Sequence, residues 1–79
     1  MGDTVPSTAS SYRIEIEGRL DPRWSSWFNG LTITVQTKDP DRVVTTLQGA
    51  VPDQASLRGI LNKIWDLNLS LISVNRLGR

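Results

Sequence analysis

Two carboxylates on one strand face are the first residues whose type and spacing could do chemistry. Glu15 and Glu17 alternate with apolar residues, so both lie on the same side of an extended strand. Such a pair can act as general acid and base. Arg13 and Arg19 share that side, however, and interleaved charges of opposite sign are typical of a solvated face with cross-strand ion pairs. The pattern therefore favours a structural role for both carboxylates.

The residue types that most often carry catalysis are missing, because the chain contains neither His nor Cys. His is the usual acid–base group near neutral pH, and thiolate chemistry requires Cys. Their absence also removes disulfides and the common ligands of zinc, copper and iron. The sequence has no Gly-rich phosphate loop and no nucleophile elbow. We therefore expect a protein that is not an enzyme, with no catalytic residues, no cofactor and no metal.

An aromatic cluster is the most unusual local feature of the sequence. Trp24, Trp27 and Phe28 stand at helical spacing, which places the three rings on one side of a short helical turn. The rings either close one end of the core or form part of a recognition surface, since Trp, Tyr and Arg are enriched at binding hot spots. The candidate binding surface consists of the cluster and its charged neighbours: Arg19, Asp21, Arg23, Trp24, Trp27 and Phe28.

A second function class is a sensing domain that binds a small molecule or an anion. Free backbone N–H groups at a helix N-terminus attract anions, and a helix is expected to begin after Asp53. Its pocket would lie between the aromatic turn and Asp53, lined by Trp24, Trp27 and Gly18. An exposed Trp on a flat surface favours the interaction module, and a partly open cavity favours the sensing domain.

The elements that must position these residues follow from the hydrophobic pattern. Alternation of apolar and polar residues predicts strands, Asp21 and Pro22 open a short helical turn that stops at Asn29 and Gly30, and Asp53 caps the main helix. The helix ends near Asn68, and Trp65 on its flank is expected to pack in the core. The predicted strands cover residues 12–20, 31–37, 42–50 and 69–74.

The fold class is therefore α+β: one four-stranded, mostly antiparallel sheet with one main helix packed on one face, in the order β-β-β-α-β. We expect the first three strands to form a meander, and the helix to return the chain so that the fourth strand runs parallel to the first and third. Docking beside the first strand gives the order 4-1-2-3, and pairing beside the third satisfies the same pattern.

The sheet face away from the helix is predicted to be polar. It either meets water or, with an edge strand, pairs with a second copy of the chain. RNA-binding sheets present aromatic rings at positions where this face has Glu and Thr. Its residues are Arg13, Glu15, Glu17, Arg19, Thr32, Thr34, Gln36, Val44, Thr46 and Gln48.

Length and charge limit the number of domains and the kinds of partner. A chain of 79 residues holds one domain, which we place at 12–77, after a flexible tail at 1–11 and before a frayed end at 78–79. A core of this size is often supplemented by self-association, so a homodimer or another protein partner is expected. The net charge of +1 disfavours nucleic-acid binding. No segment is apolar enough to cross a membrane, and we expect a cytoplasmic location.

The stretch from Leu20 to Ile33, Leu-Asp-Pro-x-Trp-Ser-x-Trp-Phe-x-Gly-Leu-Thr-Ile, also carries a resemblance. With the segments from Asp53 to Leu61 and from Leu71 to Leu77, it resembles a family of small prokaryotic proteins of unknown function. The likeness covers residues 12–77. It implies a compact domain that stands alone, and it assigns no catalytic residue.

Overall fold

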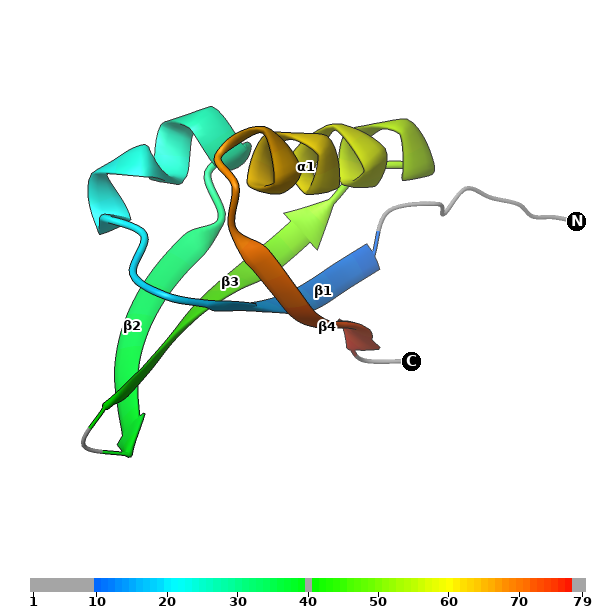
Figure 1. Ribbon diagram of the computed structural model, residues 1–79. Helices are drawn as coiled ribbons and strands as arrows, with labels where there is room; N and C mark the ends of the chain where they lie inside the picture. Colours follow the sequence, from blue (N-terminus) through cyan, green and yellow to red (C-terminus); the bar gives the residue numbers. More distant parts are fainter. Residues whose placement is uncertain (1–9, 40, 78–79) are drawn as a thin grey trace, which may run out of the picture.

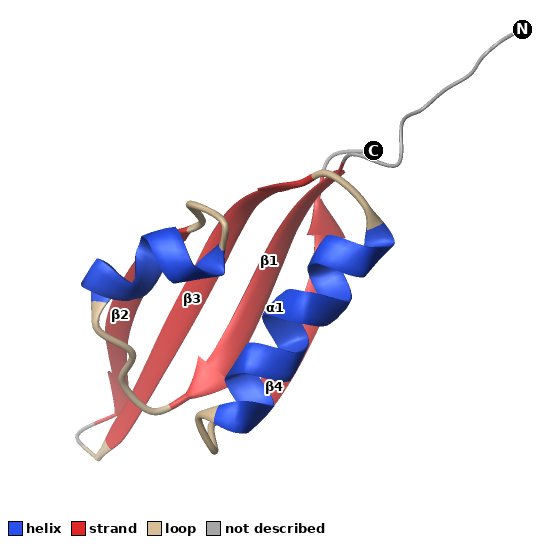
Figure 2. Cartoon of the chain, turned by 90° about the horizontal axis from the view of Figure 1, so that it is seen from above, coloured by secondary structure: helices blue, strands red, loops and turns tan. Residues whose placement is uncertain are grey.

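The computed structural model of the chain describes residues 10–39 and 41–77, which form one sheet with both helical segments on the same side (Figures 1 and 2). The predicted α+β class is confirmed. In chain order the elements are β1 (Ser10–Glu17), the 3-10 helix η1 (Pro22–Phe28), β2 (Thr32–Asp39), β3 (Arg42–Val51), α1 (Gln54–Asp66) and β4 (Ser70–Leu77).

The sheet is antiparallel throughout, with the order β2-β3-β1-β4. The fourth strand docks beside the first, as predicted, but the predicted meander is wrong, because β1 pairs with β3 and β2 lies at the edge. The predicted parallel alignment of β4 with β1 is also wrong, since these strands are antiparallel. The element order is the β-α-β-β-α-β pattern of ferredoxin-like domains, with η1 in place of the first helix.

The reason for the different order is the connection after β1. Gly18 has a φ of 101°, which a residue with a Cβ rarely adopts, and its carbonyl accepts a hydrogen bond of 2.6 Å from the Thr45 hydroxyl. The same hydroxyl accepts the backbone N–H of Leu20 at 3.1 Å. These bonds turn the chain out of β1 onto the helix side of the sheet. A crossover follows instead of a tight hairpin, and β3 fills the position between β1 and β2.

Most element boundaries follow the predicted signals, but the first strand ends at Glu17 and not at the predicted Leu20, because the chain turns at Gly18. Asp53 accepts the N–H of Ser56 at 2.7 Å as the cap of α1, and Asn68 just beyond the helix has a φ of 64°. The last strand is longer than expected and reaches Leu77, so Arg76 belongs to the sheet. Of the expected tail, residues 1–9 lie outside the described residues, and Ser10 and Ser11 belong to β1. The expected frayed end at 78–79 also lies outside them.

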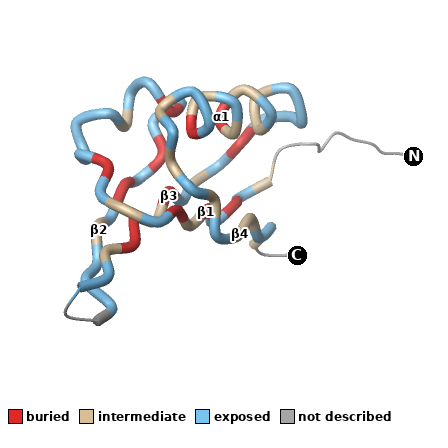
Figure 3. Tube along the Cα trace, viewed as in Figure 1, coloured by how far each residue is buried: buried red, intermediate tan, exposed pale blue. Residues whose placement is uncertain are grey.

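The core sits between the sheet and the two helical segments (Figure 3). The α1 side contributes Ile60 and Ile64, and η1 contributes Phe28, each with 1% or less of its surface exposed. The other buried members are Tyr12, Ile14, Ile16, Leu20, Leu31, Ile33, Leu47 and Val51. Above the core, η1 lies over the β2 side of the sheet and α1 lies over the β4 side (Figure 2).

Candidate binding surface

The short helix η1 is formed by capping residues at both of its ends. The Asp21 carboxylate accepts the N–H of Arg23 at 2.9 Å, and Pro22 occupies the first helical position, where no backbone donor is needed. At the other end Asn29 adopts the left-handed conformation, with a φ of 60°. The predicted start and stop are thus confirmed, and a seven-residue segment gains a fixed backbone.

The aromatic cluster divides between core and surface. Phe28 is fully buried and meets Trp27 edge to face, with ring centroids 5.3 Å apart. Trp24 and Trp27 pack against each other at 5.2 Å, and each leaves 39% of its surface exposed. The two expectations for this cluster therefore apply to different residues: Phe28 fills the core, and the two Trp rings form a paired aromatic patch on the outside.

Two contacts from other parts of the chain hold the patch in place. The Ser25 hydroxyl donates a hydrogen bond of 2.6 Å to the carbonyl of Leu31, which ties η1 to the start of β2. The Lys63 ammonium donates a hydrogen bond of 2.6 Å to the carbonyl of Trp27, and it lies 5.3 Å from the centroid of the Trp27 ring. Sequence reasoning missed Lys63, because its distance from Trp27 along the chain gave no signal of contact.

Charged residues surround the patch at the η1 N-terminus. Arg23 and Asp21 form an exposed ion pair with an N–O distance of 3.2 Å. The N–H of Arg23 holds the pKa of Asp21 below its usual value, and the Arg23 and Arg19 side chains act in the same direction. Arg19 is itself exposed. We call the exposed set Arg19, Asp21, Arg23, Trp24 and Trp27 the aromatic surface.

The pocket expected between the aromatic turn and Asp53 is not formed, because the two lie at opposite ends of α1. The contact from η1 reaches Lys63, ten residues beyond the Asp53 cap, which corresponds to about 15 Å along the helix. At the N-terminus the Asp53 carboxylate already accepts the Ser56 N–H, and this bond lowers the pKa of Asp53. An incoming anion would therefore meet a negative charge.

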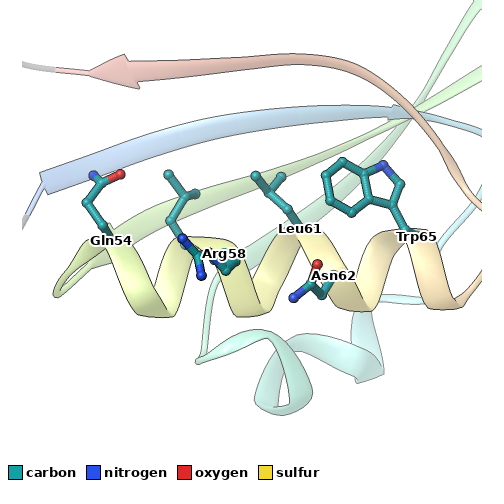
Figure 4. Close-up of a pocket in the computed structure, with 6 residues that line it drawn as sticks. Gln54, Arg58, Leu61, Asn62 and Trp65 are labelled. Carbon is teal, nitrogen blue, oxygen red and sulfur yellow. The ribbon is translucent and has the colours of Figure 1, made fainter.

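Trp65 was expected in the core, and this expectation is wrong, since 54% of its surface is exposed. It lies one helical turn after Leu61 on the flank of α1 that faces the β4 side (Figure 4). The flank forms an open hollow of about 410 Å³, which we call the helix groove. Sequence periodicity placed Trp65 at the edge of the apolar stripe of the helix. Periodicity does not show how much of that edge the sheet covers. Its lining residues are Gln54, Leu57, Arg58, Leu61, Asn62 and Trp65.

The sheet face away from α1 has the predicted polar character. Directly paired residues share a face, and the observed pairs include Arg13 with Gln48, Glu15 with Thr46 and Thr34 with Thr46. A hollow of about 380 Å³ runs across this face. Glu15 accepts a hydrogen bond of 3.3 Å from Ser73, and Glu17 pairs with Arg42 at 3.3 Å. Both carboxylates are therefore engaged in cross-strand contacts.

In the part of the chain that the structure describes, the pKa is lowered for two exposed aspartates, Asp21 and Asp53, both of which cap helices. No group of three or more acidic side chains in residues 10–39 and 41–77 could hold a metal ion. Within these ranges, neither helix is long and apolar enough to cross a membrane.

Comparison with known proteins identifies a family. Residues 11–75 match the sequence model of a domain of unknown function, DUF8691. No curated protein and no solved structure matches the chain significantly. The predicted resemblance to a family of unknown function is thus confirmed.

Proposed function

The chain belongs to the DUF8691 family, and we propose that it is a non-catalytic interaction module that binds a protein partner through the aromatic surface. The observation that supports this most strongly is the pair of packed, half-exposed rings of Trp24 and Trp27. Large aromatic side chains beside Arg carry much of the binding energy at protein interfaces. The exposed Arg23 stands next to this pair.

The rigidity of the aromatic surface supports a role in binding. Ordering a flexible segment on binding costs free energy, and a surface that is already ordered avoids that cost. The η1 backbone is fixed by its two caps, by the Ser25 bond and by the Lys63 bond. Trp24 and Trp27 also restrict one another through direct ring contact. A partner therefore meets a preformed site.

The exposed ion pair gives this surface a polar rim. Asp21 and Arg23 lie in water beside the rings, and the charged groups at the rim of an interface steer encounter and set orientation more than they add affinity. An apolar centre with a charged margin is the usual composition of a protein-binding patch. The proposal includes a cytoplasmic location, which cell fractionation tests.

Site-specific photo-crosslinking in the source cells tests the proposal. A photoreactive amino acid replaces Ser26, which is exposed and lies between Trp24 and Trp27 in the sequence. Matched control proteins carry the same amino acid at Asn62 on α1 or at Gln48 on the far sheet face. We expect adducts from position 26, and their loss when Trp24 and Trp27 are both changed to Ala. Equal yields from all three positions, or adducts from position 62 or 48 alone, contradict the proposal.

A further inference from the structure

Positive charge is in excess around the exposed Trp pair. Arg19 and Arg23 lie at the N-terminal end of η1, and the Lys63 ammonium reaches Trp27 from α1. Asp21 is the acidic residue of this surface, and its carboxylate already accepts hydrogen bonds from the backbone and the side chain of Arg23. The cations therefore outnumber a carboxylate that is itself engaged.

Each of these cations keeps charge or donors for a partner. Arg19 is exposed and forms no ion pair within the part of the chain that the structure describes. Arg23 directs its Nε toward Asp21, and 81% of its side chain is exposed, so the terminal guanidinium nitrogens stay accessible. Lys63 donates to a neutral carbonyl, and among the described residues it forms no ion pair with Asp66, one turn along α1. Its positive charge is therefore not neutralised.

The other hollowed surfaces do not combine paired rings with several cations. The helix groove is lined by one aromatic residue, Trp65, and one cation, Arg58. The hollow on the far sheet face is lined by Arg13 and Lys38 together with Glu15, and it has no aromatic lining residue. The aromatic surface is thus the place where a partner can meet both an apolar centre and a positive margin.

We propose that the segment bound by the aromatic surface is an acidic peptide: its apolar side chain packs on the Trp pair while its carboxylates meet Arg19, Arg23 and Lys63. Hydrogen bonds from guanidinium and ammonium groups to carboxylates are stronger than those between neutral groups. Opposite charges on two surfaces also speed their encounter and disfavour partners of the wrong sign. This inference rests on the proposed interaction function and names its partner class.

The arrangement of the rings favours a peptide over a single-stranded nucleic acid, which is also negatively charged. Bases bind aromatic side chains by stacking flat on an open ring face. Trp24 and Trp27 are tilted by 56° to one another, so two successive stacked bases cannot lie flat on both rings. The Lys63 ammonium lies over the Trp27 ring. The net charge of +1 also gives little attraction for a phosphate backbone.

Selection from a library of random peptides displayed on phage tests the inference with the full chain. The immobilised wild type selects binders, and fluorescence polarisation measures the Kd of each recovered peptide. We expect these peptides to contain more Asp and Glu than the unselected library. A protein with both Trp24→Ala and Trp27→Ala should bind them at least about tenfold more weakly. Added NaCl should also weaken binding, because it screens exposed charges.

Charge reversal at two exposed arginines separates local complementarity from the effect of net charge. Arg19→Glu changes the aromatic surface, and Arg58→Glu makes the same change in the helix groove. The two variants have the same net charge, and both side chains are exposed, so both proteins should fold. We expect Arg19→Glu to weaken binding of the selected peptides about tenfold, and Arg58→Glu to weaken it less than about twofold.

The outcomes separate this inference from the proposed function. Neutral or basic peptides that depend on the Trp pair, or equal effects of the two charge reversals, would overturn the inference and leave the proposed function standing. An oligothymidylate that binds the Trp pair more tightly than any selected peptide would make nucleic acid the ligand. A dimer that shields both rings would make a second copy the partner. Either result overturns the inference.

Failure to recover any peptide that depends on the Trp pair also overturns the inference. If position 26 then gives no crosslinked adducts, the proposed function is refuted with it. If adducts form at position 26 without such a peptide, the proposed function stands and the acidic partner does not.

Discussion

Lys63 on α1 contacts Trp27 on η1 in two ways: its ammonium donates a hydrogen bond of 2.6 Å to the Trp27 carbonyl and lies 5.3 Å from the ring centroid. This is a direct polar link between the main helix and the aromatic surface. It fixes both the backbone and the ring of one residue of the Trp pair, so the rigidity on which the proposed function depends should be sensitive to Lys63.

We expect Lys63→Met to reduce the free energy of unfolding by about 1 kcal/mol, since a charged hydrogen bond and a cation–π contact are both lost at a partly exposed site. Trp fluorescence should also become more accessible to acrylamide. The control is Arg58→Met, which removes a positive charge from the same helix away from η1. Equal effects of the two substitutions on quenching would contradict a specific role for Lys63.

Phe28 and Trp24 should respond very differently to truncation, although both belong to the predicted cluster. Phe28→Ala leaves a cavity in the core and should cost about 3–5 kcal/mol, which is enough to unfold a domain of this size. Trp24→Ala should leave a folded protein, because Trp24 is substantially exposed. Circular dichroism and urea unfolding measure both. A folded Phe28→Ala protein of near wild-type stability would contradict the assignment of Phe28 to the core.

Thr45 is the one polar side chain among the fully buried residues of the described chain, and its hydroxyl joins Gly18 to Leu20. Thr45→Val keeps the shape but leaves the Leu20 N–H and the Gly18 carbonyl without that partner. We expect a loss of about 1–3 kcal/mol in unfolding free energy. Thr46→Val, on the next residue and the polar face, is the matched control and should change stability little. Equal losses would show that the hydroxyl bonds of Thr45 do not hold the turn.

Acid should destabilise the protein through its two capping aspartates. Hydrogen bonds from Arg23 and Ser56 lower the pKa of Asp21 and Asp53, whose ordinary value is 3.8. A carboxylate with a lowered folded pKa stabilises fully above the unfolded value, and this contribution is lost as pH falls through the folded value. With no His in the chain, no imidazole titrates near neutral pH.

We therefore expect the urea midpoint to stay level from about pH 8 to pH 5 and to fall below about pH 4. Asp53→Asn retains an oxygen that can cap the helix but does not titrate, so its midpoint should fall less steeply in acid. A midpoint that changes mainly between pH 6 and pH 8 would contradict this account.

Local signals predicted most of the elements, and the non-local arrangement was harder. Three helix boundaries were predicted correctly, because each depends on residues that are neighbours in the sequence. They are the cap of α1 at Asp53, the start of η1 at Asp21 and Pro22, and its end at Asn29. The strand order was not predicted correctly, because it depends on contacts between segments distant in sequence, such as the β1–β3 ladder and the bond from Thr45 to Gly18. The face of a strand follows from alternation, but its neighbour in the sheet depends on where the crossover runs.

The candidate surface was predicted in part for the same reason. Spacing identified Trp24 and Trp27 as a pair on one side of a turn but could not separate them from Phe28, which occupies the core. The role of Lys63 was not predicted, because its contact with Trp27 joins segments that are distant in sequence. Trp65 was misplaced because helix periodicity defines a stripe, whereas burial depends on which strands lie beneath it.

Trp65 should be the Trp residue most accessible to solvent in the monomer, with 54% of its surface exposed against 39% for Trp24 and for Trp27. Variants that retain a single Trp, with Phe at the other two positions, allow each to be quenched separately by acrylamide. In dilute protein we expect the strongest quenching for Trp65. Equal quenching of the three variants, or weaker quenching of Trp65 than of Trp24 and Trp27, would contradict these exposures.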